Sequence, residues 1–122
     1  MLSFSLFPCQ IIMQMTKYLF RQIRIEHNLY LAIKIFCVQY EIALFNFYET
    51  ALSWFFRETN DKKINYRATY RKGKLLTVRI NQFLAVKVKK LAFEANVSDA
   101  CVIYTALVSY IEANPIKQPP SN

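Results

Sequence analysis

Two segments of the chain, 20–25 and 75–80, alternate apolar and polar side chains with the period of a β-strand. The apolar side chains share one face of the two predicted strands, and they are Ile23, Ile25, Val78 and Ile80. The polar side chains share the opposite face, and they are Gln22, Arg24, Thr77 and Arg79. Each segment therefore predicts a short strand with a core-facing side and an outward-facing side.

A helical pattern follows each predicted strand. After the second strand the apolar residues recur at spacings of i, i+4/5 and i+8, and they are Phe83, Leu84, Val88, Leu91, Ala92 and Ala95. Asn81 is suited to cap this helix, and Asn96 to end it in the left-handed conformation. Ser98 is suited to cap a second helix, which must end before Pro115 because a residue before proline avoids the helical region.

The strand–helix–helix pattern occurs twice, at an offset of 55 residues. Over positions 22–57 the offset gives seven identities, which are Arg24, Ile25, Leu29, Lys34, Thr50, Ala51 and Leu52. A lone strand is not stable in water, so the two strands must find partners, within one chain or between two chains. The connector between the copies, residues 59–74, is long enough to permit pairing within one chain.

The first copy departs from the pattern at its helix–helix turn. This turn is expected at 41–43, which holds no Gly, no Asn and no capping side chain. The second helix then begins later, with Asn46 as its cap, or the two helices run together. This helix also carries an excess of aromatic residues, namely Phe45, Phe47, Trp54, Phe55 and Phe56. Either the first dozen residues or another molecule is expected to cover those that one core cannot bury.

Composition fits one small folded domain with a polyanionic partner. The 122 residues are 54% hydrophobic with a single glycine, and the formal net charge is +8. Such a charge indicates nucleic acid or an anionic membrane as the partner. A membrane span is not expected, because residues 1–16 fall short of the roughly 20 apolar residues that a span needs. These residues also lack the basic start and cleavage site of a signal peptide, and Met13 or Met15 is an alternative start.

Enzymatic and metal-binding chemistry are not expected. The three cysteines are scattered and the chain has one histidine, so neither a metal site nor a disulfide framework is predicted, and a reducing cytoplasm suits the chain. No Gly-rich phosphate loop, carboxylate pair or nucleophile with a neighbouring base occurs in the sequence. We therefore expect no catalytic residues and no cofactor.

The segments LTVRIN, LAFEANVSDA and IYTALVSYI, within 75–112, resemble the ribbon-helix-helix family of DNA-binding proteins, the MetJ/Arc family. Asn96 stands where that family usually has a glycine, and Ser98 stands at its capping position. The tandem form is similar to the TraY proteins, which are accessory proteins of conjugative plasmid relaxosomes. The resemblance implies a mostly α fold with a small β ribbon, in which a two-stranded antiparallel sheet and four helices form a single-chain pseudo-dimer.

The domain organisation that follows has five parts. They are an apolar leader of open status at 1–16, a first and degenerate ribbon-helix-helix unit at 17–58, a basic linker at 59–74, a second unit at 75–114 and a disordered tail at 115–122.

A two-stranded ribbon fits the major groove of B-DNA, so the outward-facing residues are the expected base contacts. Arg24 and Arg79 are suited to guanine O6 and N7, Gln22 to adenine, and Thr77 to the thymine methyl. Because the two strands differ in sequence, the preferred site need not be palindromic. Phe20 and Leu75 occupy the next outward positions and either touch thymine methyls or mark an earlier end of each strand.

Phosphate contacts are expected beside the ribbon. The candidates are Ser98 at the start of a helix and the basic residues of the connector, above all Arg71, Lys72 and Lys74. The connector is expected to act as one mobile basic arm, made of Lys62, Lys63, Arg67, Arg71, Lys72 and Lys74. The negative charge of Asp99 at that helix start is expected to disfavour a bound phosphate. The expected partners are double-stranded DNA, with a homodimer or a relaxase-type protein as further partners, in a relaxosome accessory protein or a transcriptional repressor. The alternative is a small basic interaction protein whose apolar N-terminal half docks on a membrane or a protein.

Overall fold

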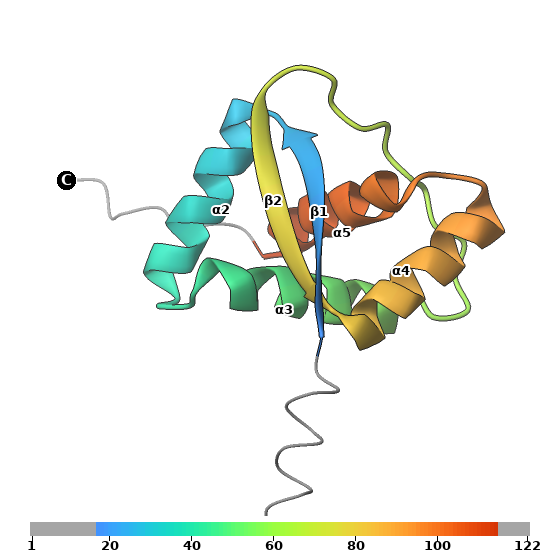
Figure 1. Ribbon diagram of the computed structural model, residues 1–122. Helices are drawn as coiled ribbons and strands as arrows, with labels where there is room; N and C mark the ends of the chain where they lie inside the picture. Colours follow the sequence, from blue (N-terminus) through green and yellow to red (C-terminus); the bar gives the residue numbers. More distant parts are fainter. Residues whose placement is uncertain (1–16, 115–122) are drawn as a thin grey trace, which may run out of the picture.

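The computed structural model describes residues 17–114, so the predicted leader 1–16 and tail 115–122 lie outside the described residues. Strand β1 (Tyr18–Ile25) pairs with β2 (Lys74–Asn81) as a two-stranded antiparallel sheet. Four helices complete the fold: α2 (His27–Gln39), α3 (Leu44–Glu58), α4 (Gln82–Ala95) and α5 (Asp99–Ala113). The predicted fold, mostly α with a small β ribbon, is confirmed, and one chain supplies both strands of the ribbon (Figure 1).

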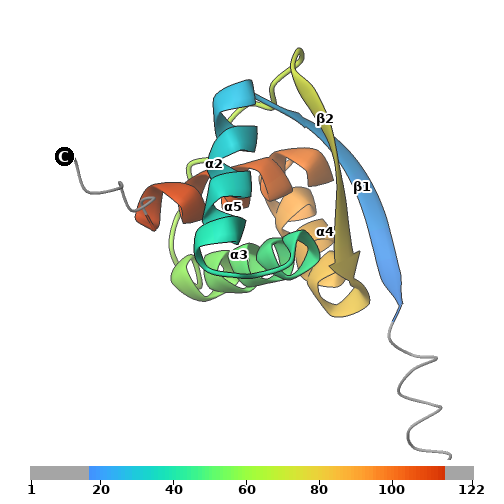
Figure 2. The ribbon, with the colours of Figure 1, turned by 90° about the vertical axis from the view of Figure 1, so that its left-hand side faces the viewer.

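The four helices lie on one side of the ribbon and leave its other side open (Figure 2). The four predicted side chains, Ile23, Ile25, Val78 and Ile80, face the helices and are all buried, and Leu76 is buried on the same face of β2. The repeated Thr-Ala-Leu segment contributes to the same core, because Leu52 and Leu107 are both fully buried on α3 and α5. Alternation along two strands therefore builds one core-facing layer and one free face.

The repeat offset of 55 residues describes the structure as well as the sequence. Helix α3 (44–58) shifted by 55 gives 99–113, the bounds of α5. The left-handed residue that ends α2 is Glu41, with φ 53°, and its counterpart at 41 + 55 = 96 is Asn96, with φ 57°. Gln22 lies directly opposite its own counterpart Thr77 in the ribbon. A pseudo-twofold axis therefore passes through the Gln22–Thr77 pair.

The turn of the first copy lies where it was expected, and its two helices do not run together. Helix α2 ends at Gln39 and α3 begins at Leu44, with Ala43 at the cap position, so the predicted later cap at Asn46 is wrong. Ala43 has the extended backbone of a cap, with φ −70° and ψ 149°, but no side-chain hydrogen bond. Its counterpart Ser98 has φ −80° and ψ 159°, and its Oγ accepts from the N–H of Cys101 at 3.1 Å.

We expect Ala43→Ser to stabilise the protein by about 1 kcal/mol, because a serine hydroxyl at this position can accept an orphan N–H of the first turn of α3. The matched control is Ser98→Ala, which removes the same interaction from α5 and should destabilise by about the same amount. Urea unfolding followed by circular dichroism measures both changes. Equal stability of Ala43→Ser and the wild-type protein would contradict the expectation.

The buried face of α4 is narrower than its apolar pattern predicts. Leu84, Val88 and Ala92 are buried as expected, but Phe83 is 66% exposed and Ala95 is exposed. Each residue turns a helix by about 100°, so Phe83 points away from the face that is centred between Leu84 and Val88. The assignment of Phe83 and Ala95 to the core was therefore wrong.

The aromatic excess of α3 is only partly buried within the described residues. Phe47 and Phe55 are buried, Trp54 and Phe56 are half-buried, and Phe45 is exposed. Tyr110 of α5 covers part of this set, since its ring lies 5.7 Å from that of Phe47 and 5.4 Å from that of Trp54, measured between centroids. The core of the single chain thus accommodates most of these side chains.

Two buried tyrosines differ in their hydrogen bonding. The hydroxyl of Tyr104 donates to the Glu26 carboxylate, whereas the buried hydroxyl of Tyr48 has no partner among the described residues. Burial raises the pKa of both phenols, and the hydrogen bond to Glu26 and its negative charge raise the pKa of Tyr104 further. The Tyr104 hydroxyl thus links α5 to the residue that follows β1. No hydrogen bond within the described residues offsets the desolvation of the Tyr48 hydroxyl.

This difference predicts opposite effects of the same substitution. Tyr104→Phe should destabilise by about 1–2 kcal/mol, since it leaves the Glu26 carboxylate without its donor. Tyr48→Phe should be neutral or stabilising by up to about 1 kcal/mol, since it removes an unpaired buried hydroxyl. Thermal and urea unfolding of the two variants test the pair, and a loss of stability in Tyr48→Phe as large as in Tyr104→Phe would contradict it.

Within the described residues, no single helix is long and apolar enough to cross a membrane. The pairs α2–α3 and α4–α5 reach such a length and composition only when each pair is taken together, and they bend by 103° and 106° at their turns.

Candidate nucleic-acid interface

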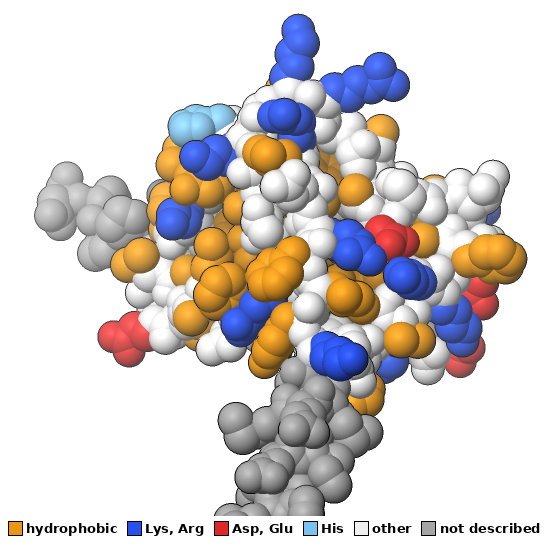
Figure 3. Space-filling view, in the orientation of Figure 1, with side chains coloured by type: hydrophobic (Ala, Val, Ile, Leu, Met, Phe, Trp, Pro, Cys, Tyr) orange, Lys and Arg blue, Asp and Glu red, His pale blue; other side chains and the backbone are white. Residues whose placement is uncertain are grey.

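The outward side of the ribbon is the candidate interface, and we call it the ribbon face. It consists of Tyr18, Phe20, Gln22 and Arg24 of β1 with Leu75, Thr77 and Arg79 of β2. All seven side chains are exposed except Arg79, which is half-buried. Figure 3 looks onto this side of the molecule, where hydrophobic and basic side chains predominate and acidic ones are few. The structure brings the four predicted base-contact residues together on this one surface.

The register sets the spacing of these residues. Gln22 and Thr77 lie opposite each other at the centre, Arg24 lies opposite Leu75, and Arg79 lies opposite Phe20. The two arginines are therefore four residues apart along the ribbon, or about 14 Å at the usual rise of a strand. That length matches about four base pairs at the roughly 3.4 Å rise of B-DNA. Phe20 and Leu75 lie inside the strands, so the strands do not end before them.

The two arginines have different surroundings. Arg24 is exposed, and its Nη1 donates to the carbonyl oxygen of Gly73 at 3.2 Å. The Cζ of Arg79 lies 4.1 Å from the ring centroid of Tyr18 and also 4.1 Å from that of Phe45. Its Nε is buried and has no hydrogen-bond partner among the described residues. We call Tyr18 and Phe45 the aromatic clamp of Arg79.

The aromatic clamp was not predicted from the sequence. Tyr18 lies before the alternating segment in which the strand was recognised, and Phe45 belongs to a helix that follows another strand. The only signal for Phe45 was its position in an aromatic set too large for one core. That the Phe45 ring lies beside Arg79 of β2 follows only from the packing of α3 against the ribbon.

A basic cluster lies at the Arg24 end of the ribbon. Arg71 and Lys72 are exposed in the bend that precedes β2, and Lys74 is exposed at the first position of β2, opposite Ile25. The Nζ of Lys74 lies 5.2 Å from the ring centroid of Tyr30. These three predicted phosphate contacts are thus held next to the ribbon face, where they are suited to reach the DNA backbone beside the groove.

The N-terminus of α5 carries the fourth predicted phosphate contact. Ser98 is exposed at the cap position of this helix. The negative charge of Asp99 is offset by Arg21, whose Nε lies 3.6 Å from the Asp99 carboxylate. The sequence did not predict this role of Arg21, because only apolar side chains were expected on the inward face of β1. Arg21 lies on that face in the middle of the strand, opposite Val78. This ion pair partly neutralises the Asp99 carboxylate, the charge expected to disfavour a phosphate at this helix start.

The prediction of one mobile basic arm in the connector needs correction. Arg67 is anchored on α5. Its Nη2 lies 2.7 Å from the Glu112 carboxylate, and its backbone N–H donates to the Oγ1 of Thr105 at 3.0 Å. Lys62 and Lys63 lie elsewhere, at the rim of a pocket of about 620 Å³ between the connector and α4. Because Arg67 in the middle of the connector is bonded to α5, only the end of the connector, with Arg71, Lys72 and Lys74, lies beside the ribbon.

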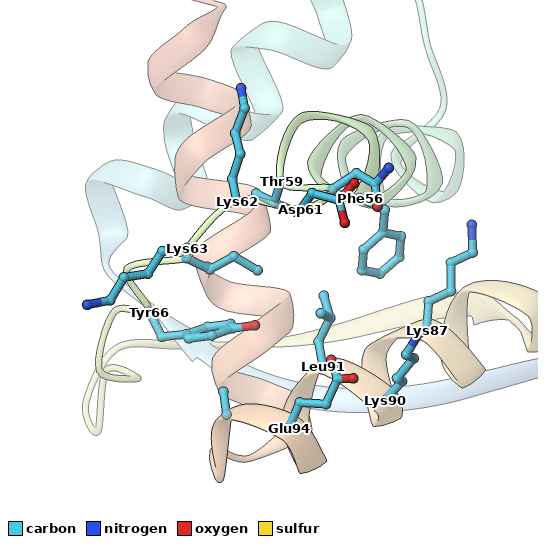
Figure 4. Close-up of a pocket in the computed structure, with 13 residues that line it drawn as sticks. Phe56, Thr59, Asp61, Lys62, Lys63, Tyr66, Lys87, Lys90, Leu91 and Glu94 are labelled. Atoms are coloured by element: carbon cyan, nitrogen blue, oxygen red, sulfur yellow. The ribbon is translucent and has the colours of Figure 1, made fainter.

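Apolar, basic and acidic side chains all line the pocket beside α4. Figure 4 shows Phe56 and Leu91 pointing into it, while the ammonium groups of Lys62, Lys63 and Lys87 point away. No group of three or more His, Cys, Asp or Glu side chains that could hold a metal ion occurs in the described part of the chain. Cys37 and Cys101 are buried free thiols whose pKa is raised by burial.

The candidate interface is therefore the ribbon face with its basic cluster. No protein-family model, curated protein or solved structure matches the chain.

Proposed function

We propose that the protein binds double-stranded DNA sequence-specifically by inserting its two-stranded ribbon into the major groove. The observation that supports this most is the free ribbon face, which carries Gln22, Arg24, Thr77 and Arg79 while all four helices cover the other side. A two-stranded ribbon of this kind has the width that the major groove admits. Arginine and glutamine present the paired donors and acceptors that base edges require.

The charge distribution favours the same function. The net charge of +8 provides a general attraction to a polyanion, and the basic cluster of Arg71, Lys72 and Lys74 concentrates part of it at one end of the ribbon. Phosphate contacts by these side chains would fix the register of the ribbon on the duplex without specifying sequence. We further propose a role as a relaxosome accessory protein or a transcriptional repressor, two roles that use one ribbon in the same way.

Selection of binding sites from random-sequence DNA tests the proposal. We expect the wild-type protein to enrich a site, and Arg24→Ala and Arg79→Ala each to change the affinity or the site preference. Loss of one bidentate base contact should lower discrimination at that base by about 5- to 150-fold, which corresponds to about 1–3 kcal/mol. Arg57→Ala is the matched control, because it removes the same charge from the exposed end of α3, outside the ribbon. Its site preference should equal that of the wild-type protein. If neither ribbon variant changes affinity or preference, the proposal is wrong.

One observation favours a second function, docking on a membrane or a protein partner. Leu31, Ile35 and Val38 are exposed on one side of α2, and Val38 is 77% exposed. Such an apolar stripe is typical of contact surfaces. Sedimentation of the protein with anionic vesicles, combined with a failure to enrich any DNA site, would favour this second function over DNA binding.

A further inference from the structure

The pseudo-twofold symmetry makes Arg24 and Arg79 equivalent, since 24 + 55 = 79, but their neighbours are not equivalent. The clamp residue Tyr18 has Gly73 as its counterpart (18 + 55 = 73), and Phe45 has Ala100 (45 + 55 = 100). Neither counterpart has a ring. Arg79 therefore has two aromatic rings at 4.1 Å from its Cζ, whereas Arg24 donates to the backbone carbonyl of Gly73.

The aromatic clamp restricts how Arg79 can form hydrogen bonds. Rings at 4.1 Å from Cζ cover the guanidinium, and the Nε is buried. The two Nη groups are then the part of the guanidinium left to bind a ligand, and two parallel N–H groups are the geometry that guanine O6 and N7 accept. Because contact with two rings restricts the guanidinium before binding, less side-chain entropy is lost when the bonds form.

Arg24 lacks this preorganisation. It is exposed and has one hydrogen bond, to a carbonyl oxygen in the bend before β2. An exposed arginine of this kind can reach either a base edge or a neighbouring phosphate, so it discriminates less between bases. The basic cluster lies at the same end of the ribbon and adds phosphate contacts there.

We propose that the two ends of the ribbon have different tasks: Arg79, positioned by Tyr18 and Phe45, is the stringent base-reading residue, and the Arg24 end chiefly grips the DNA backbone. This inference rests on the proposed DNA-binding function. It implies a DNA site with one strictly specified end and one permissive end, on which the protein binds in a single orientation. Tyr18 and Phe45 are positioning residues, because they act through Arg79.

Phe45→Leu and Ala100→Phe form a matched pair that tests the inference. Phe45→Leu removes one ring but keeps an apolar side chain at a position that is 45% exposed, so the fold should persist. Ala100→Phe adds a ring at the equivalent place beside Arg24. In random-sequence selection the wild-type protein should discriminate about 10-fold more strongly at the Arg79 end than at the other end. Phe45→Leu should abolish that difference, and Ala100→Phe should raise discrimination at the Arg24 end alone.

A measurement without DNA tests the clamp itself. The Nε–Hε group of Arg79 should show slow hydrogen exchange and restricted motion by nuclear magnetic resonance, whereas that of Arg24 should exchange freely, and Phe45→Leu should make the two alike. Equal behaviour of the two arginines in the wild-type protein would overturn the inference. DNA binding with equal discrimination at both ends of the site would also overturn the inference, but it would leave the proposed function standing. Absence of any DNA binding would overturn the proposed function and this inference together.

Discussion

Phe47→Ala is expected to destabilise the protein by about 3–5 kcal/mol, the usual cost of truncating a fully buried phenylalanine. Phe47 is fully buried on α3, and its ring centroid lies 5.4 Å from that of Phe36 on α2 and 5.7 Å from that of Tyr110 on α5. Its removal leaves a cavity where three helices meet. Because small domains have only about 5–15 kcal/mol of stability, the variant should be near its unfolding transition.

Urea unfolding monitored by circular dichroism measures this loss. Phe93→Ala is the matched control: it removes the same atoms from a ring that is 89% exposed on α4, and it should change stability by less than about 0.5 kcal/mol. If Phe47→Ala lost no more stability than Phe93→Ala, the packing of α2, α3 and α5 around this ring would be incorrect.

Gly73→Ala is expected to cost about 1–3 kcal/mol through its backbone alone and more through its contacts. Gly73 has φ +120°, a conformation that side-chain-bearing residues rarely adopt, and a Cβ there would lie 2.4 Å from the carbonyl oxygen of Ile25. The clash is with backbone, so the entry into β2 must move. Since the Gly73 carbonyl accepts from Arg24, the Arg24 end of the ribbon should be disturbed as well.

The neighbouring Lys72→Ala is the control for Gly73→Ala, because Lys72 is exposed in the same bend and its φ is not in the left-handed region. It should leave stability unchanged to within about 0.5 kcal/mol. Thermal unfolding of the two variants, with amide hydrogen exchange along β1 and β2, separates a local disturbance from a global one. Equal melting temperatures of Gly73→Ala and the wild-type protein would show that the bend tolerates a side chain.

The backbone plan of the fold was predictable because it depends on local periodicity. Alternation in two short segments placed Ile23 and Val78 on the inner face, and the caps at Asn81 and Ser98 follow from side chains that bond within one helical turn. Glu41 was not predictable as a left-handed residue, since a glutamate carries no such preference; the geometry of the turn, shared with Asn96, imposes it.

The candidate site was predictable in its list of outward residues but not in their individual surroundings. Arg24 and Arg79 have the same place in the repeat, so nothing local distinguishes them. The difference comes from contacts across the fold, such as that of Arg79 with Tyr18, which is 61 positions earlier (79 − 18 = 61). Contacts of this kind exist only after the ribbon has formed and α3 has packed beside it.

During synthesis on the ribosome, β1 cannot pair within its own chain until β2 has been made. The paired positions are 49 residues apart for Ile25 and Lys74 (74 − 25 = 49) and 63 apart for Tyr18 and Asn81 (81 − 18 = 63). At synthesis rates of about 5–20 residues per second, β1 waits roughly 3–11 s before all of β2 has been made. During that interval its hydrogen-bonding edge has no partner in its own chain. The strand of another nascent chain is then its nearest substitute, so an exchange of strands between two chains is the misfolding route that this topology favours.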